Sequence, residues 1–73
     1  MDCPICGAQA RNVTPGEFDG LVIKCIHCGD YEVPDSAVNG LIRLDYEGRR
    51  GALEKAKIVA GAGTRPSITL ACL

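Results

Sequence analysis

Aromatic residues are scarce in this sequence. Its 73 residues include no Trp, one Phe and two Tyr, so the apolar content consists largely of Ala, Val, Ile and Leu. Each of these side chains buries a modest area, and so short a chain seldom buries enough apolar surface to offset the entropy that folding costs. The length fits one domain, residues 1–73. We therefore expect a single domain whose small core needs a further source of stability.

The chain also lacks a long hydrophobic run. A membrane-spanning helix requires about 20 consecutive apolar residues, and no segment provides them. A secretory signal requires a basic start and an apolar stretch of roughly 7–15 residues. The sequence opens instead with Met-Asp-Cys-Pro. We expect no association with a membrane and a cytoplasmic location, in which cysteine thiols stay reduced.

Cysteine, in contrast, is abundant. Four of the five cysteines stand in two Cys-x-x-Cys-Gly segments, residues 3–7 and 25–29, which gives the pattern C-x2-C-x18-C-x2-C. Two cysteines three positions apart can turn both sulfur atoms onto one ion, at about 2.3 Å. The glycine after each pair permits a tight turn that brings backbone amides near the sulfur atoms. The pattern predicts one Zn²⁺ ion per chain, held by the thiolates of Cys3, Cys6, Cys25 and Cys28.

Other uses of the cysteines fit the pattern less well. The odd count argues against the disulfide framework of a secreted protein, and a thioredoxin-like motif uses one Cys-x-x-Cys pair rather than two. An iron centre of the rubredoxin type stays open, because tetrahedral sulfur ligation also suits iron. Cys72 is expected to be a small apolar core residue, with a reactive thiol or a disulfide-linked dimer as alternatives. His27 is expected to be an exposed residue rather than a ligand.

Residues suited to catalysis are few. Four thiolates leave a tetrahedral zinc ion no open position for water or substrate. The single histidine, His27, is poorly placed as a base for Ser36 or Ser67. No glycine-rich segment has the spacing of a phosphate-binding or dinucleotide-binding loop. We expect no enzymatic activity.

Strand and turn signals dominate the first half of the chain. Thr14-Pro15-Gly16 and Asp19-Gly20 are turn segments. Short strands are expected at residues 10–14, 21–24 and 31–33, with a further edge strand at residues 68–70. The expected fold class is a small α+β metal-bound domain. We expect two cysteine knuckles on a short antiparallel sheet, followed by one or two helices.

Two helices are expected after the sheet. Asp35 or Ser36 can cap the first helix, which runs to about residue 44. The second helix covers residues 47–60 and ends at a Gly-Ala-Gly segment. The side chains expected to face the core are Val38, Leu41, Ile42 and Leu44 in the first helix and Ala52, Leu53, Ala56, Val59 and Ala60 in the second.

Charge is divided unevenly along the chain. Residues 1–40 carry six acidic and two basic side chains, a net charge of −4, whereas residues 41–73 carry three acidic and six basic ones, a net charge of +3. Four thiolates and one dication add −2, which brings residues 1–40 to −6. A polyanion is not attracted to so acidic a segment.

Five segments of the sequence are typical of a known group of proteins. They read CPICG, FDG, CIHCGDYEV, RRGALEKAK and RPSIT. With these segments the chain resembles small bacterial zinc-ribbon proteins that often occur near prophages and other mobile elements. The resemblance covers nearly the whole chain, but only its cysteine knuckles are chemically specific, and relatives commonly have proline where this chain has Ile26. It implies a zinc ribbon with an appended helix and a bacterial or phage source, and it implies no known activity.

Protein binding is the first function that these features suggest. The acidic first 40 residues could imitate nucleic-acid phosphates or dock on a basic surface. Ile58, on the polar side of the second predicted helix, is an exposed apolar side chain of the kind found in interfaces. We therefore expect a protein-interaction module, such as a phage- or mobile-element-encoded inhibitor or adaptor of a host complex.

The alternative function is nucleic-acid binding through the basic half of the chain. The basic residues of that half are Arg43, Arg49, Arg50, Lys55, Lys57 and Arg65. No aromatic residues interleave with them for base stacking, and helical spacing lets Arg50 pair with Glu47 or Glu54. Protein binding is the better-supported expectation.

Overall fold

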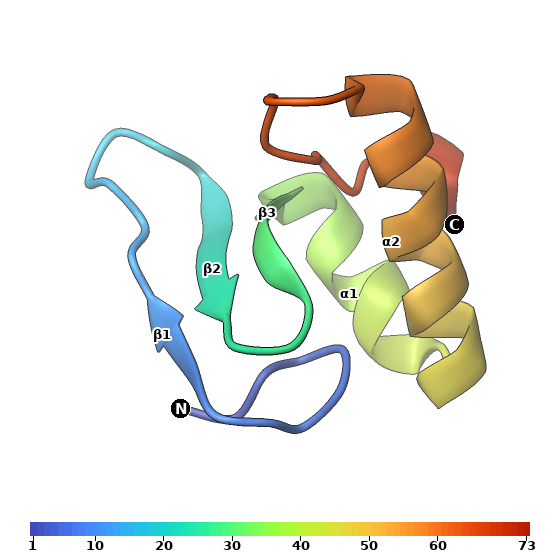
Figure 1. Ribbon diagram of the computed structural model, residues 1–73, viewed down its shortest axis with the longest axis horizontal. Helices are drawn as coiled ribbons and strands as arrows, with labels where there is room; N and C mark the ends of the chain where they lie inside the picture. The colour runs from blue at the N-terminus through green and yellow to red at the C-terminus, as the bar shows by residue number, and fades with distance from the viewer.

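The first half of the chain folds into an antiparallel sheet with the strand order β1-β2-β3 (Figure 1). In this computed structural model, which describes all 73 residues, β1 spans Ala10–Asn12, β2 spans Gly20–Cys25 and β3 spans Gly29–Pro34. Strands β2 and β3 pair over their whole length, and the tight turn between them holds the second Cys-x-x-Cys pair. The three strands confirm the predicted β-structure, with bounds shifted by a few residues.

Gly20 begins β2 at a point where a side chain has no room. Its φ is +142°, and a Cβ atom there would run into the carbonyl oxygen of Val33 and lie 2.9 Å from the amide nitrogen of Asp35. The same amide donates a hydrogen bond of 2.9 Å to the carbonyl oxygen of Asp19. The close approach at Gly20 therefore joins the start of β2 to the place where the sheet ends and the first helix begins.

We expect Gly20→Ala to lower the free energy of unfolding by about 2 kcal/mol or more, because the new methyl group meets backbone atoms that cannot move aside. Gly16→Ala is the matched control, since Gly16 has no atom within 4 Å of its would-be Cβ and no positive φ. Urea unfolding of both variants at saturating metal measures the difference. Equal stabilities would contradict the close approach.

Helix α1 spans Asp35–Arg43 and begins directly after the sheet. The predicted caps are wrong: the N-cap residue is Pro34, no side chain caps the helix, and Asp35 lies inside the first turn. The physical reason is that sheet pairing continues to Pro34, opposite Gly20, so no free residue remains between strand and helix. The carboxylate of Asp35 in the first turn still stabilises α1, because it lies at the positive end of the helix dipole.

Only part of the predicted inward face of α1 is buried. Leu41 is buried together with Ala37, whereas Val38 and Leu44 are half-buried. Ile42 is 61% exposed, so its predicted core position is wrong. Residues 37 and 41 define a stripe one turn apart, and Ile42 lies 100° around the helix from Leu41. The face of α1 that is buried against β2 and β3 is therefore narrower than the apolar face that the sequence predicted.

Helix α2 spans Tyr46–Ala60 and packs on α1 and on the C-terminal segment. It begins at the N-cap Asp45, whose side chain accepts a 2.7 Å hydrogen bond from the amide of Gly48. Its C-cap is Gly61, as the sequence predicts. The buried residues of α2 are Ala52, Leu53 and Ala56, and Ala60 is half-buried.

The prediction that Val59 packs in the core is wrong, because this side chain is 85% exposed. Val59 lies on the last turn of α2, about 120° around the helix from Leu53. The exposure of Ile58, which is 80%, agrees with the prediction. The end of α2 therefore presents two adjacent aliphatic side chains to solvent.

The predicted edge strand at residues 68–70 does not form. The C-terminal segment meets β3 in parallel register at one position only, where Glu32 donates to the Pro66 carbonyl oxygen at 2.9 Å and accepts from the Ile68 amide at 2.8 Å. The chain then turns into a short 3-10 helix, η1, at Leu70–Cys72. This turn brings Cys72 into the core, beside the fully buried Ile68.

The core lies between the sheet and the helices, which occupy the right-hand side of Figure 1. Its largest fully buried side chains are Tyr31, Ile5, Ile23, Leu41 and Ile68. Ile5 belongs to the first cysteine knuckle, so the knuckle is part of the core rather than an appendage. No helix is long and apolar enough to span a membrane.

Candidate metal centre

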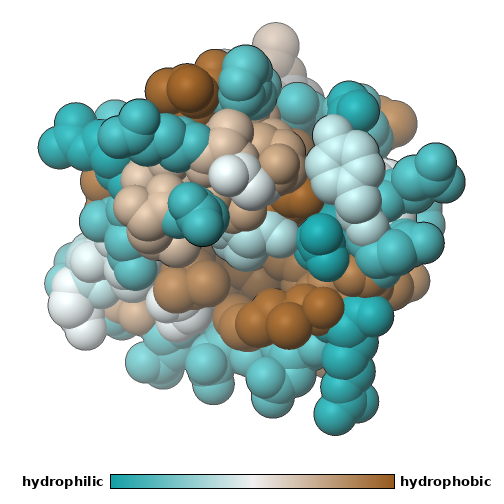
Figure 2. Space-filling model, turned by 90° about the horizontal axis from the view of Figure 1, so that it is seen from below, coloured by the Kyte–Doolittle hydropathy of each residue, from teal (hydrophilic) through white to brown (hydrophobic).

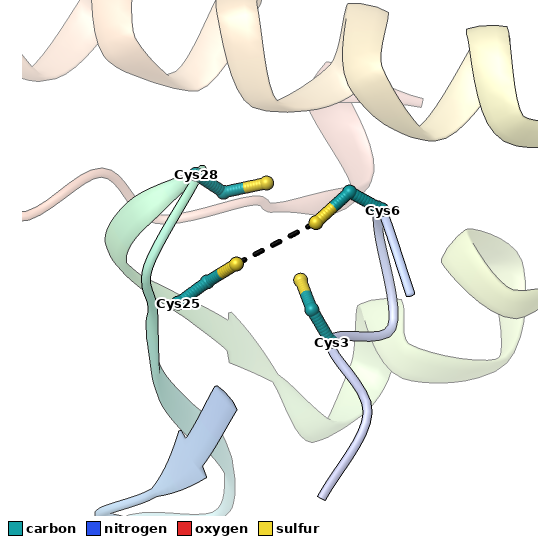
Figure 3. Close-up of side chains that lie close together, drawn as sticks. All are labelled: Cys3, Cys6, Cys25 and Cys28. Carbon is teal, nitrogen blue, oxygen red and sulfur yellow. Dashed lines mark hydrogen bonds between the residues drawn. The ribbon is translucent and has the colours of Figure 1, made fainter. Parts of the chain in front are cut away.

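The four predicted ligands converge on one point. Cys3 and Cys6 come from the loop before β1, Cys25 ends β2, and Cys28 lies in the turn that leads into β3. Their sulfur atoms lie within 4.8 Å of one another and point toward a common centre (Figure 3). All five cysteines are free thiols. The structure thus brings together every predicted ligand and confirms a cysteine cluster able to hold a metal ion.

The sulfur separations fit a tetrahedral ion. Four bonds of about 2.3 Å to a zinc ion would place the sulfur atoms about 3.8 Å apart. The Sγ atoms of Cys6 and Cys25 are 3.5 Å apart, and no pair exceeds 4.8 Å. Small side-chain rotations therefore suffice to form the tetrahedron. Four soft sulfur donors also exclude a site built for Mg²⁺ or Ca²⁺, which prefer oxygen.

Both knuckles use the same backbone geometry. The amide of Ile5 donates to the Cys3 sulfur and the amide of His27 donates to the Cys25 sulfur, each at 3.4 Å. Gly7 and Gly29 have φ values of +77° and +80°, and this left-handed conformation reverses the chain direction after each Cys-x-x-Cys pair. These positive φ values confirm the tight turn that was predicted at each glycine. The amides of Ile5 and His27, two residues past the first cysteine of each pair, donate to its sulfur.

Tyr31 contacts the cysteine cluster, which the sequence did not predict. Its side chain is fully buried, and its hydroxyl lies 3.2 Å from the Cys3 sulfur. A buried tyrosine hydroxyl requires a hydrogen-bond partner, and a thiolate is a strong acceptor. The usable signal was the position of the tyrosine, which stands two residues after Gly29 and shares the inward face of β3 with Val33.

The thiols differ in how readily they ionise. Burial raises the pKa of the Cys3 thiol, but hydrogen bonds from the Tyr31 hydroxyl and from backbone amides lower it by more, from 9.0 to about 7. Burial raises the pKa of Cys6, and burial together with neighbouring cysteines raises that of Cys28. Burial and the hydrogen bond to Cys3 raise the pKa of Tyr31, which keeps its hydroxyl a donor. One thiolate therefore forms easily, whereas the thiols of Cys6 and Cys28 ionise less readily without a cation among them.

The ligands also differ in exposure. Cys3 and Cys25 are buried, whereas Cys6 and Cys28 are half-buried and line a cleft of about 480 Å³ between the knuckles and α2. The side chains of His27, Arg50 and Lys57 line the same cleft. Lys57 pairs with Glu54 of the same cleft at 3.8 Å, so Arg50 is the cation that faces the side of the cluster on which thiolate charge reaches solvent, and it partly offsets that charge.

We expect N-ethylmaleimide to modify Cys6 and Cys28 of the metal-loaded protein several-fold faster than Cys3 and Cys25, because only the first two reach the cleft. Mass mapping of proteolytic peptides after brief treatment gives the order. Cys72 is the internal control, since it is buried and outside the cluster. Earlier modification of Cys3 or Cys25 would contradict the exposure of the cluster described here.

Arg49 has a structural use that the sequence did not reveal. Its Nη1 donates to the carbonyl oxygen of Leu44 at 2.6 Å, and its Nε donates to that of Ile5 at 3.5 Å. The guanidinium thus joins the end of α1 to the first knuckle. Arg49 was expected to be a phosphate contact in the alternative function, but these bonds occupy two of its donor atoms.

The predicted helical ion pairs of Arg50 do not form. Its guanidinium carbon lies 5.7 Å from the centre of the Tyr46 ring, and Glu54 pairs instead with Lys57 at 3.8 Å. Tyr46 is about half-exposed and lies next to the basic residues of α2. The expectation that no aromatic residue accompanies these basic residues was therefore wrong in this one position.

The two remaining candidates behave as expected. His27 is exposed and is not part of the sulfur cluster. Cys72 is buried in η1, with its sulfur 3.8 Å from both the carbonyl oxygen of Ser67 and the hydroxyl of Thr69. Cys72 is a core residue, although it lies in a 3-10 helix rather than in a strand.

Comparison of the chain with protein-family models, with curated proteins and with solved structures finds no match. The assignment of a metal centre therefore rests on four thiols that converge from two separate segments of this chain.

Proposed function

We propose that the chain is a zinc ribbon that binds one Zn²⁺ through Cys3, Cys6, Cys25 and Cys28. The observation that carries the proposal is the convergence of four sulfur atoms from two glycine-terminated knuckles on a short antiparallel sheet. Zinc is the usual occupant of paired Cys-x-x-Cys segments at this spacing, and iron is the alternative. Bound zinc would supply a permanent cross-link between the knuckles and positive charge for the thiolates.

We further propose that the protein is not an enzyme. Four protein ligands would fill the coordination sphere of zinc, so substrate and water have no position on the metal. The only histidine is exposed in a knuckle turn. A protein with a closed metal site and no catalytic base would act by binding another molecule.

We infer that its ligand is another protein. We further infer that it acts in the cytoplasm as a phage- or mobile-element-encoded inhibitor or adaptor of a host complex. Acidic and basic side chains are divided between the sheet half and the helical half of the chain. Large aliphatic side chains are also exposed, among them Ile26, Ile42 and Ile58. Figure 2 shows hydrophobic residues gathered in the middle of one face, with hydrophilic residues around them. Such surfaces support protein recognition.

The test is affinity capture from a bacterial lysate with the zinc-loaded protein as bait, with and without nuclease. We expect a discrete protein partner that survives nuclease treatment. Asp30→Lys with Glu17→Lys, both exposed positions in the acidic half, is expected to slow association with a partner that has a basic surface. Glu47→Lys, an exposed change in the basic half, is the matched control. Loss of every partner after nuclease would favour the alternative function.

That alternative is nucleic-acid binding, for which the exposed Tyr46–Arg50 pair is the one favourable observation. We nevertheless expect duplex DNA to bind with a Kd of about 10⁻⁴ M or weaker near physiological salt, the non-specific range. Arg49 is engaged with backbone carbonyls, and the acidic half repels the same polyanion. Fluorescence anisotropy across a salt series measures this. Micromolar binding that Arg50→Ala abolishes would promote the alternative over protein binding.

A further inference from the structure

A second cleft lies away from the cysteine cluster. It has a volume of about 560 Å³ and is formed by the last turns of α2 and the C-terminal segment that returns beside them (Figure 1). Aliphatic residues from both segments line it, including Ile58 and Val59 from α2 and Ala71 from η1. We call it the C-terminal groove.

The C-terminal groove leaves apolar surface in water. Ile58 and Val59 are 80% and 85% exposed, although each would gain about 1.5 kcal/mol or more if it were fully buried. They are adjacent in sequence and line the same groove, so they form one patch rather than two scattered surface residues. A patch of this kind is typical of a binding surface.

The charges of the groove restrict its occupant. Its eleven lining residues include two basic ones, Lys55 and Arg65, and no acidic one. Lys55 forms no ion pair. Arg65 is bonded through Nε to Glu32 at 3.0 Å, and its side chain remains about half-exposed. The groove therefore offers positive charge next to aliphatic surface.

Two possible occupants fit poorly. A second copy of the chain docked symmetrically on this groove would bring its own Lys55 and Arg65 against the same residues, and like charges repel. Nucleic acid would find the positive charge but no aromatic side chain on which a base could stack, since none lines the groove.

We propose that the C-terminal groove binds a protein segment in which aliphatic side chains are flanked by Asp or Glu. The aliphatic side chains would cover Ile58 and Val59, and the carboxylates would pair with Lys55 and with the free donors of Arg65. The hydroxyls of Ser67 and Thr69, which also line the groove, provide hydrogen bonds for the polar atoms of the segment. This inference rests on the proposed function, since it names the surface and the partner chemistry of a protein-interaction module.

The experiment is selection from a random peptide library displayed on phage, with the zinc-loaded protein as target. We expect enriched peptides to combine aliphatic residues with Asp or Glu, and a synthetic peptide of the consensus sequence to bind with micromolar Kd by fluorescence anisotropy. Ile58→Ser with Val59→Ser should weaken its binding at least tenfold, as should Lys55→Glu. All three positions are exposed, so circular dichroism should show unchanged folding.

Lys57→Glu is the matched control, because it makes the same charge change on α2 but lies in the other cleft. It should leave the affinity within about twofold. Enrichment of basic peptides, no enrichment, or a consensus peptide that binds the groove variants equally well would overturn the inference. So would a concentration-dependent dimer in sedimentation that Ile58→Ser with Val59→Ser abolishes.

The two proposals can fail separately. A lysate partner that binds the groove variants normally but is weakened by charge reversal in the acidic half would keep the protein-interaction function and overturn the groove. Nuclease-sensitive capture overturns the protein-interaction function, whereas the peptide selection tests the groove alone.

Discussion

Cys25→Ser is expected to abolish metal binding and to leave the protein without a cooperative unfolding transition. Structural zinc contributes roughly 10–16 kcal/mol of apparent binding free energy in finger-like peptides, whereas a whole domain is stable by only about 5–15 kcal/mol. Cys25 is buried and ends β2, and its sulfur lies 3.5 Å from the Cys6 sulfur. Elemental analysis should find about one zinc per chain in the wild type and none in the variant, and thermal melts by circular dichroism should report the loss of folding.

Cys72→Ser provides the matched control for this prediction. Cys72 is also buried, but it lies outside the cluster, so its replacement should keep one zinc per chain and a cooperative melt. Elemental analysis also decides between zinc and iron. Unchanged thermal stability of Cys25→Ser would show that the four thiols are not metal ligands, and a loss of metal in Cys72→Ser would mean that the ligand set is incomplete.

Leu53→Ala is expected to lower the free energy of unfolding by roughly 2–5 kcal/mol, the range for a large aliphatic side chain removed from a packed core. Leu53 is 4% exposed and belongs to the core cluster that includes Cys3 and Cys25. Its removal leaves a void between α2 and the knuckles. Urea unfolding at saturating metal measures the effect.

Val59→Ala is the control on the same helix. Because Val59 is 85% exposed, its truncation should cost less than about 0.5 kcal/mol. Hydrophobic periodicity assigned both residues to the core, so this pair of variants tests the structure directly against the sequence pattern. Comparable losses for the two variants would mean that the C-terminal part of α2 packs differently.

The elements that the sequence predicted well are those with local causes. The cysteine pairs and their glycines specify tight turns within five residues, so the ligand set and the strands beside it follow from spacing alone. Helix α2 has a periodic apolar stripe and a glycine after it, both of which are local features of the sequence. Its bounds were therefore predicted to within one residue.

The parts that the sequence predicted poorly depend on distant contacts. Ile42 and Val59 look like core residues until the positions of the sheet and the C-terminal segment are known. The hydrogen bonds from Tyr31 to Cys3 and from Arg49 to Ile5 join residues 28 and 44 positions apart, and no local pattern encodes them. The C-terminal segment has strand propensity, but only one of its residues is in register with β3.

The hydrogen bonds of Arg49 bear on how the molecule would open. With an ion bound, the chain from residue 3 to residue 28 and the metal–sulfur bonds form a closed ring. Both helices lie outside this ring. Their packing against it depends on noncovalent contacts, of which the Arg49 bond to Ile5 is one. Local unfolding can therefore release α2 while the ring stays closed. Amide hydrogens of β2, which lies within the ring, would then exchange with solvent only in global unfolding, and those of α2 would exchange in a smaller, more frequent fluctuation that exposes the helical half first.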